Sequence, residues 1–312
     1  MKKSLYFTII SLLLCVAISS CTKDKTHSNT LTIGIMPDVD SIPFIIAEKN
    51  GYYQEENVNV KIEYFKSAKD RDSALQSGSL DGVITDMLAV IFANEGGIRL
   101  IVPAKSDGDI KLVASKKSGI MTIKDVKGKK LGLSTNTIME YTVDKILELE
   151  GIRPEEISKI AIPQIPTRLE MLNGGKIDAA ILPDPLSLLA TKDGAYELCS
   201  IEKLKEDISI GVVAFTEKVL TEKTEQTKAL FRAYNKAVDY LHKEPIGNYI
   251  DFIIKTQGFP ENIKDAMKLP KYTKAELPSE KNFYSAVKWL KGKNLIKNDY
   301  DYASIVNNNY LR

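Results

Sequence analysis

The feature that most constrains this chain is a stretch of sequence that occurs twice, ninety-seven positions apart. Residues 71–86 read RDSALQSGSLDGVITD, and residues 168–184 read RLEMLNGGKIDAAILPD. Each copy has the pattern of a helix, a turn containing Gly, a short apolar strand and then an acidic residue. Aligned without gaps, four of eleven positions are identical: Arg71 with Arg168, Leu75 with Leu172, Gly78 with Gly175, and Asp81 with Asp178. A repeated helix–strand unit predicts two α/β lobes.

The length and the positions of polar segments suggest how these lobes are assembled. A chain of 312 residues fits two lobes of roughly 100 to 150 residues each. The polar stretch 104–110 predicts one crossing between lobes, and the apolar strand Ile208–Phe215 predicts the return. We therefore expect residues 31–108 and 212–312 in lobe 1 and residues 109–211 in lobe 2. Each lobe should be a mixed, mainly parallel sheet flanked by helices, and a two-segment hinge should join them.

The N-terminus has the pattern of an export signal. Lys2 and Lys3 precede an apolar run of about fourteen residues, which suits a signal peptide and is short for a membrane span. The run ends in Ile18-Ser19-Ser20-Cys21, which resembles a bacterial lipobox and implies cleavage after residue 20 and a diacylglyceryl group on Cys21. Residues 21–30 would then tether the fold to the outer face of a cell membrane. A plain secretory peptide with an incidental Cys21 is the alternative.

Cysteine and charge content exclude some classes of function. Cys15 leaves with the signal peptide and Cys199 has no partner, so the mature fold cannot use an internal disulfide. We interpret Cys199 as a small buried residue at the end of a strand-like segment rather than as a nucleophile. The 43 basic and 41 acidic side chains nearly balance, and no basic stripe interrupted by aromatic residues occurs. Nucleic acid is therefore not an expected partner, and we expect a monomer.

The periodicity of apolar residues predicts the order of elements. Strands are expected at Leu31–Met36, Val58–Phe65, Gly82–Thr85, Arg99–Pro103, Lys129–Leu133, Ile157–Ile162, Ile177–Leu182 and Ile208–Phe215. Helices are expected at Ile42–Asn50, Ser67–Ser77, Met87–Asn94, Ile138–Glu150, Arg168–Asn173, Leu186–Lys192, Thr221–Lys243, Pro245–Gln257 and Pro278–Leu290. Ser41 and Thr167 are expected to cap helices, and Trp289 to lie in the core. We interpret Arg71 and Arg168 as structural residues away from the binding site.

Three motifs resemble a known family. They are AEKNGYY at 47–53, the repeated L-x-x-G-x-[LI]-D, and DVKGKKLG at 125–132. In this order and spacing the chain resembles the solute-binding lipoproteins of ABC importers with a type II periplasmic-binding-protein fold. It is most similar to the NMT1/THI5-like group, which includes SsuA-like sulfonate binders and binders of taurine, nitrate and thiamine pyrimidines. The resemblance covers nearly the whole mature chain, and it implies a receptor that closes on a small molecule and delivers it to a permease and its ATPase.

The expected binding site follows from the sheet architecture. In an open α/β sheet, ligands bind beyond the carboxyl ends of the strands. The candidates from both lobes are Asp38, Asp40, Ser41, Thr85, Asp86, Ser134, Thr135, Asn136, Thr137 and Asp184. Each has a plainer interpretation. Asp86, Asp184 and the 134–137 cluster could only cap helices, and Asp38 and Asp40 could form a solvated turn. The helix after residue 137 could instead offer its free N–H groups to an anion.

The charge of these candidates bears on the ligand. Four carboxylates, those of Asp38, Asp40, Asp86 and Asp184, are expected to converge without any Lys or Arg. Such a pocket opposes an anion and favours an N–H donor. We therefore predict a cationic or amine-bearing small molecule, such as a thiamine pyrimidine precursor. An aliphatic sulfonate, taurine or nitrate is the alternative.

An enzyme on the same fold and a ligand sensor are the alternative classes of function. Thiaminase-like and pyrimidine-synthase relatives imply a reactive cysteine or a substrate histidine, but Cys199, His27 and His242 do not lie beside a candidate loop. No Ser-His-Asp order, metal-ligand cluster or phosphate-binding loop occurs either. We expect no catalytic residues, no metal and no cofactor. A sensor that signals to a membrane receptor fits the sequence as well as an importer does.

Overall fold

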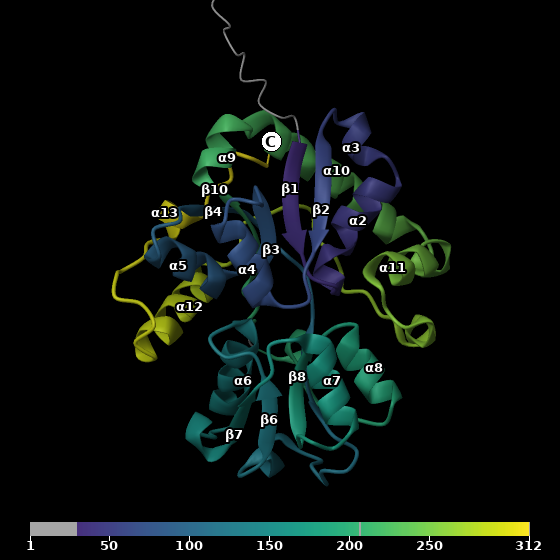
Figure 1. Cartoon of the computed structure of the whole chain (residues 1–312), viewed down its shortest axis with the longest axis vertical. Helices are drawn as coiled ribbons and strands as arrows, with labels where there is room; N and C mark the ends of the chain where they lie inside the picture. The colour runs from purple at the N-terminus through teal and green to yellow at the C-terminus, as the bar shows by residue number, and fades with distance from the viewer. Residues whose placement is uncertain (1–29, 206, 312) are drawn as a thin grey trace, which may run out of the picture.

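The computed structural model describes residues 30–205 and 207–311. The expected α/β fold of two lobes, each with a mixed sheet flanked by helices, is confirmed. Figure 1 shows lobe 1 above and lobe 2 below. The signal peptide, most of the tether and Cys21 lie outside the described residues, and Thr30 already belongs to the first strand. Within the described residues, no helix combines the length and the apolarity needed to cross a bilayer.

The sheet of lobe 1 has five strands, of which one runs against the others. Its order is β2 (Asn59–Tyr64), β1 (Thr30–Ile35), β3 (Gly82–Asp86), β10 (Gly211–Thr216) and β4 (Leu100–Lys105). Strands β1, β2 and β3 are parallel, and β10 pairs antiparallel with both β3 and β4.

The sheet of lobe 2 repeats this arrangement. Its order is β7 (Ser158–Ala161), β6 (Lys130–Leu133), β8 (Ala179–Pro183), β5 (Ile110–Ala114) and β9 (Tyr196–Ser200). Strands β6, β7 and β8 are parallel, whereas β5 pairs antiparallel with β8 and β9. The chain therefore crosses to lobe 2 between β4 and β5 and returns between β9 and β10.

Helices cover both faces of the two sheets (Figure 1). In lobe 1 they are α2 (Ile42–Lys49), α3 (Tyr52–Glu55), α4 (Ala68–Gln76), α5 (Met87–Glu95), α9 (Glu217–Glu222), α10 (Thr224–Lys243), α11 (Ile250–Gln257), α12 (Glu280–Gly292) and α13 (Tyr302–Ile305). In lobe 2 they are α6 (Ile138–Leu149), α7 (Ile165–Asn173) and α8 (Leu186–Lys192). The short 3-10 turn η6 (Glu261–Ala266) follows α11.

The structure explains why the repeated motif recurs. Asp81 accepts a hydrogen bond from the N–H of Thr32 at 2.8 Å, and Asp178 accepts one from the N–H of Lys130 at the same distance. Each aspartate thereby fixes the strand that follows it against a neighbouring parallel strand, β1 in lobe 1 and β6 in lobe 2. The glycines before them, Gly78 and Gly175, have φ values of 78° and 69°, which Gly adopts without a steric penalty. The motif is therefore the turn that sets the register of each sheet.

Several local predictions were wrong. Strand β5 was not expected at all, and the single helix expected at Thr221–Lys243 is divided at Lys223 into α9 and α10. Helix α7 begins at Ile165, so Thr167 does not cap it. Ser41 precedes α2 but makes no side-chain cap, because its hydroxyl donates to the Asp38 carbonyl.

Candidate functional site

The loop after β1 places Asp38 at the carboxyl edge of the lobe 1 sheet. Its side chain is 8% exposed, and its Oδ1 has no hydrogen-bond partner among the described residues. Its backbone carbonyl accepts from the Gln257 side-chain amide at 3.1 Å. Burial and the neighbouring Asp40 raise the pKa of Asp38 well above its usual value, although Arg71 opposes the shift. Asp38 is thus a buried carboxyl with one unpaired oxygen, whose desolvation is only partly offset by Arg71 and Ser41.

Asp40 lies against the crossing between the lobes. Its Oδ2 accepts from the Ser106 hydroxyl at 2.8 Å. A side chain at Gly108 would collide with its Oδ1, so only glycine fits that point of the crossing. Burial raises the pKa of Asp40 to about 6, even though the bond from Ser106 lowers it. The crossing segment therefore covers the Asp40 carboxylate and donates a hydrogen bond to it.

The end of β3 brings Thr85 and Asp86 beside Arg71. The Arg71 guanidinium is almost fully buried and donates to the Ile84 carbonyl at 2.9 Å and to the Thr85 hydroxyl at 2.6 Å. Asp86 caps α5 by accepting from the N–H of Ala89 at 3.0 Å. Burial raises the pKa of Asp86 to about 6, with Arg71 opposing. Arg71 is structural as expected, but the expectation that it lies away from the site was wrong.

The corresponding loop of lobe 2 has the same construction. Arg168 is fully buried, and it donates to the Ile181 carbonyl at 2.7 Å and to the Ser134 hydroxyl. Thr137 caps α6 by accepting from the N–H of Met139 at 3.2 Å. Thr135 and Asn136 are exposed, and Asn136 has a φ of 57°. The repeat therefore places a buried arginine beside a candidate residue in each lobe, Arg71 beside Thr85 and Arg168 beside Ser134.

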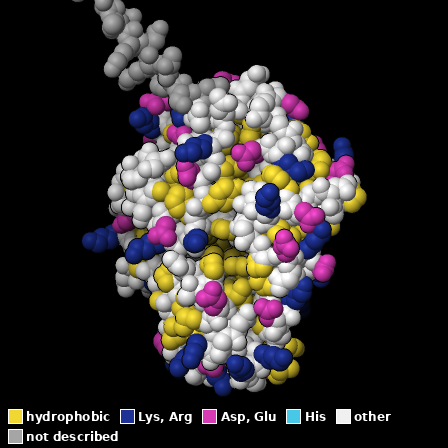
Figure 2. Space-filling model, turned by 45° about the vertical axis from the view of Figure 1, so that its right-hand side comes forward, with side chains coloured by type: hydrophobic (Ala, Val, Ile, Leu, Met, Phe, Trp, Pro, Cys, Tyr) yellow, Lys and Arg dark blue, Asp and Glu magenta, His cyan; other side chains and the backbone are white. Residues whose placement is uncertain are grey.

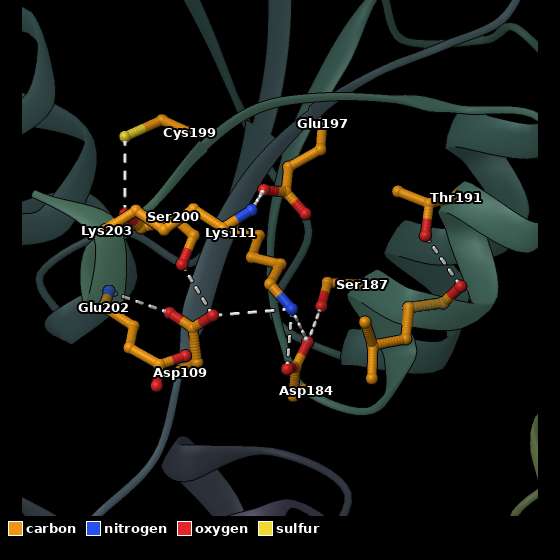
Figure 3. A network of polar contacts seen from close by, with 11 residues as sticks. Asp109, Lys111, Asp184, Ser187, Thr191, Glu197, Cys199, Ser200, Glu202 and Lys203 are labelled. Atoms are coloured by element: carbon orange, nitrogen blue, oxygen red, sulfur yellow. Dashed lines mark hydrogen bonds and ion pairs between the residues drawn. The ribbon is translucent and has the colours of Figure 1, made fainter. Parts of the chain in front are cut away.

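The fourth expected carboxylate, Asp184, is neutralised by a lysine that the sequence did not reveal. Lys111 of β5 donates to both Asp184 oxygens, at 2.9 and 2.7 Å, and lies 3.4 Å from Asp109 (Figure 3). Ser187 donates to the same Asp184 carboxylate. Burial still raises the pKa of Asp184, with Lys111 lowering it. The prediction of a site without Lys or Arg was wrong, since the antiparallel strand β5 carries Lys111 into it.

One cavity joins residues from both lobes. Its volume is about 70 Å³, and it lies between α4, α5 and the first turn of α6. Four of the expected residues line it, two from each lobe: Thr85, Asp86, Asn136 and Thr137. The end of β3 and the segment after β6 therefore meet across the interface, whereas Asp184, at the end of the second copy of the motif, does not line this cavity.

A cluster of charged and aromatic residues bridges the lobes beside this cavity. We call it the α6–α12 clasp; it consists of Glu140, Asp144 and Lys159 of lobe 2 and Trp289 and Lys293 of lobe 1. The indole N–H of Trp289 donates to Asp144 at 3.0 Å, and Lys293 donates to Glu140. Lys159 contacts Glu140 at 2.8 Å and Asp144 at 2.6 Å. Trp289 is half-buried, so it is an interlobe contact as well as a core residue.

The clasp connects directly to the cavity. Glu140 accepts from the backbone N–H of Asn136 at 2.7 Å, and Asn136 lines the cavity. Burial disfavours the ionised form of Glu140, but this N–H and the ammonium groups of Lys159 and Lys293 outweigh it and lower its pKa. The Glu140 carboxylate thus links the contacts between the lobes to the segment that lines the cavity.

Among the residues considered for catalysis, Cys199 and His242 do not line the cavity, and His27 lies outside the described residues. Cys199 is half-buried in β9, and burial raises the pKa of its thiol to about 11, which disfavours the nucleophilic thiolate. His242 bonds to the Tyr272 carbonyl at 2.8 Å. Among the described residues, no group of three or more His, Cys, Asp or Glu side chains is arranged to hold a metal.

Two sheets whose strand ends meet at one interface define a bilobed α/β fold. Residues 38–247 match the model of the NMT1/THI5-like family. Because the match covers more than half of the chain, the protein belongs to that family.

Individual relatives agree with this assignment. A Brachyspira hyodysenteriae protein named as an ABC transporter periplasmic binding protein is 23% identical, over 76% of this chain and 74% of its own. A 4-amino-5-hydroxymethyl-2-methylpyrimidine phosphate synthase of Saccharomyces cerevisiae is 21% identical, over 92% and 88%. The alkanesulfonate-binding protein SsuA of Xanthomonas axonopodis, solved with MOPS, superposes with a TM-score of 0.76 at 18% identity, over 89% of this chain and 98% of SsuA.

Proposed function

We propose that this protein is the solute-binding component of an ABC importer that captures an amine-bearing heterocycle between its lobes and delivers it unchanged to the permease. The observation that carries the proposal is that both lobes form the walls of hollows at one interface: Thr85 and Asp86 face Asn136 and Thr137 across one of them, and α7 and α8 face the end of α11 across another. A ligand held by both lobes stabilises the closed arrangement, which a permease can distinguish from the open one.

The preference for an amine rests on two buried carboxylates. With Asp184 paired to Lys111 and Asp40 bonded to Ser106, Asp38 and Asp86 remain as acceptors for a ligand. Burial raises the pKa of both, and a donor N–H or an ammonium group would offset that desolvation. The synthase relatives are named for an aminopyrimidine product, which has this chemistry.

The connections between lobes complete the proposal. We take the segment between β4 and β5 and the one between β9 and β10 as the hinge, with lobe 1 formed by residues 31–108 and 212–312. Residues 1–20 would be removed on export, and a lipid on Cys21 would hold a monomer at the outer face of the membrane. Detergent partitioning of the wild type against a Cys21→Ser variant tests the anchor, because only the lipidated form should enter the detergent phase.

Thermal-shift screening tests the ligand class most broadly. The panel contains 4-amino-5-hydroxymethyl-2-methylpyrimidine, polyamines, amino acids, taurine, an alkanesulfonate and nitrate. A ligand at one hundred times its Kd stabilises the folded state by about 2.7 kcal/mol, which raises the Tm measurably. We expect the pyrimidine to raise the Tm, and Asp38→Asn to reduce the shift while the exposed Asp299→Asn does not. A rise with taurine or the sulfonate and none with any amine would overturn the ligand class.

A further inference from the structure

A second hollow lies between the lobes, on the side of the interface opposite the clasp. Its volume is about 440 Å³, and apolar side chains predominate in its wall. Figure 2 shows hydrophobic side chains gathered in a hollow at the middle of this face. Lobe 2 contributes the starts of α7 and α8, and lobe 1 contributes the end of α11; the apolar residues are Pro37, Ile165, Pro166, Leu169, Leu186, Leu189, Phe259 and Pro260. We call it the α7–α11 pocket.

The two interlobe hollows differ in what they can hold. The cavity beside the clasp, at about 70 Å³, is large enough for water but not for an organic solute. The α7–α11 pocket, at about 440 Å³, falls within the range of about 300 to 1,000 Å³ that is usual for small-molecule sites. The bulk of a ligand therefore fits only the second of these two.

One polar group in the wall of the pocket lacks a partner. Gln257, at the end of α11, is 6% exposed, and its Oε1 accepts no hydrogen bond from the described residues. Its amide nitrogen donates to the Asp38 carbonyl, which orients the side chain. Leaving a buried acceptor unpaired is costly, so such groups commonly mark a ligand or water site. The neighbouring Asp38 Oδ1 is unpaired as well.

A larger hollow elsewhere does not share these features. It measures about 670 Å³ and lies against the crossing segments, but charged side chains such as Lys105, Asp107 and Glu202 line it. Neither of the two unpaired buried oxygens belongs to its wall. Its wall is therefore more polar than that of the α7–α11 pocket and holds neither of the unpaired buried acceptors that could receive an N–H from a ring.

We propose that the α7–α11 pocket takes a flat, largely apolar ring and that Gln257 Oε1 accepts an N–H from that ring. This inference rests on the proposed function and sharpens it, because it moves the body of the ligand from the clasp side to the α7–α11 side. Leu169 and Leu189 from lobe 2 and Phe259 from lobe 1 would pack on the ring. Gln257 then becomes the residue that distinguishes an N–H-bearing ring from a purely apolar one, or from an oxyanion without a donor.

Calorimetric titration of the purified protein with 4-amino-5-hydroxymethyl-2-methylpyrimidine tests the assignment. Leu189→Trp fills the pocket, and Gln257→Met removes the acceptor with little change in volume. We expect each variant to bind at least about tenfold more weakly than the wild type. The matched controls are Leu149→Trp and Gln54→Met, both at exposed positions, and neither should change the affinity. Circular dichroism melts confirm that every variant is folded.

The outcomes separate this inference from the proposed function. Wild-type binding that both pocket variants leave intact would overturn the pocket assignment, while a loss on Asp38→Asn in the same series would leave the proposed function standing. Should Leu189→Trp prove unfolded, Gln257→Met with its control decides the question. Binding of taurine or nitrate alone would overturn both the ring and the amine. An absence of binding to every compound would contradict both proposals.

Discussion

The two sides of the lobe interface differ in polarity: one is held by ion pairs and hydrogen bonds, and the other is a largely apolar hollow. On the clasp side, α6 and α12 meet through ion pairs and an indole N–H around Glu140 and Asp144. On the other side, α7 and α8 face the end of α11 across an apolar hollow, and Lys192 of α8 donates to the Asn262 carbonyl at its rim. Polar contacts of fixed geometry hold one arrangement of the lobes, whereas an unfilled apolar pocket gains stability only when something occupies it. In the proposed function, the clasp would set the closed geometry and the pocket would make closure depend on a ligand.

The largest effect is expected from removing the charge at the centre of the clasp. Glu140→Gln leaves Lys159 and Lys293 short of a counter-charge in a buried setting, so the free energy of unfolding should fall by about 3 kcal/mol. Denaturant titration measures it. Glu148→Gln on the same helix breaks an exposed pair with Lys145 and should cost less than about 0.5 kcal/mol. Equal losses in both variants would show that the clasp is an ordinary surface pair.

A pH-dependent effect is expected at the cavity beside the clasp. The pKa of Asp86 is raised to about 6, so its contribution to stability is full below about pH 4 and is lost as the pH rises through 6. Asp86→Asn keeps an N-cap but removes this titration. The stability of the variant relative to wild type should therefore increase by about 2 kcal/mol between pH 4 and pH 7. Thermal melts across this range measure it, and a constant difference would contradict the burial argument.

A smaller effect should appear in ligand affinity rather than in folding. Trp289→Phe keeps the ring but removes the hydrogen bond to Asp144, which should weaken the closed state by about 1 kcal/mol. The affinity for a bound solute should then fall by up to about fivefold, because the closed form is less populated. Tyr284→Phe is the matched control, since its hydroxyl bonds within lobe 1 to Asp301. If both variants bind alike, the clasp does not bias closure.

The smallest effect is expected from removing an exposed polar contact of α8 near the pocket. Lys192→Met removes an exposed contact with the Asn262 carbonyl. Such contacts contribute little, so the Tm should shift by less than about 1 °C and the affinity should not change. A large loss of affinity would show that a polar contact also holds the pocket side closed, which would remove the contrast between the two sides.

The doubled motif made most of the fold predictable from the sequence. It carries its own turn glycine and register-setting aspartate, so each copy specifies a local structure without help from distant residues. Strand β5 escaped prediction because IKLVA contains a lysine in a fully buried strand, which breaks the apolar pattern expected there. Because β5 was not predicted, Lys111 was not counted among the charges at the site. The prediction of four carboxylates without a neighbouring Lys or Arg was therefore wrong.

The residues at the ends of strands that line the cavity could be predicted from the sequence. The contacts between segments distant in sequence could not. Thr85, Asp86, Asn136 and Thr137 follow directly from the rule that loops after strands face the cleft. Gln257 lies 219 positions from Asp38 and meets it only through the packing of α11. No local periodicity signals such a contact. The clasp could not be predicted either, because α6 and α12 lie far apart in the sequence and in different lobes.

Hydrogen–deuterium exchange with and without a saturating bound solute tests the central claim most directly. If the ligand is enclosed between the lobes, protection should rise at the same ligand concentration in residues 134–140 and 186–190 of lobe 2 and in residues 257–260 of lobe 1. The clasp segment 285–293 should be protected as well. Protection confined to one lobe, or to the outer strands β2 and β7, would contradict the account.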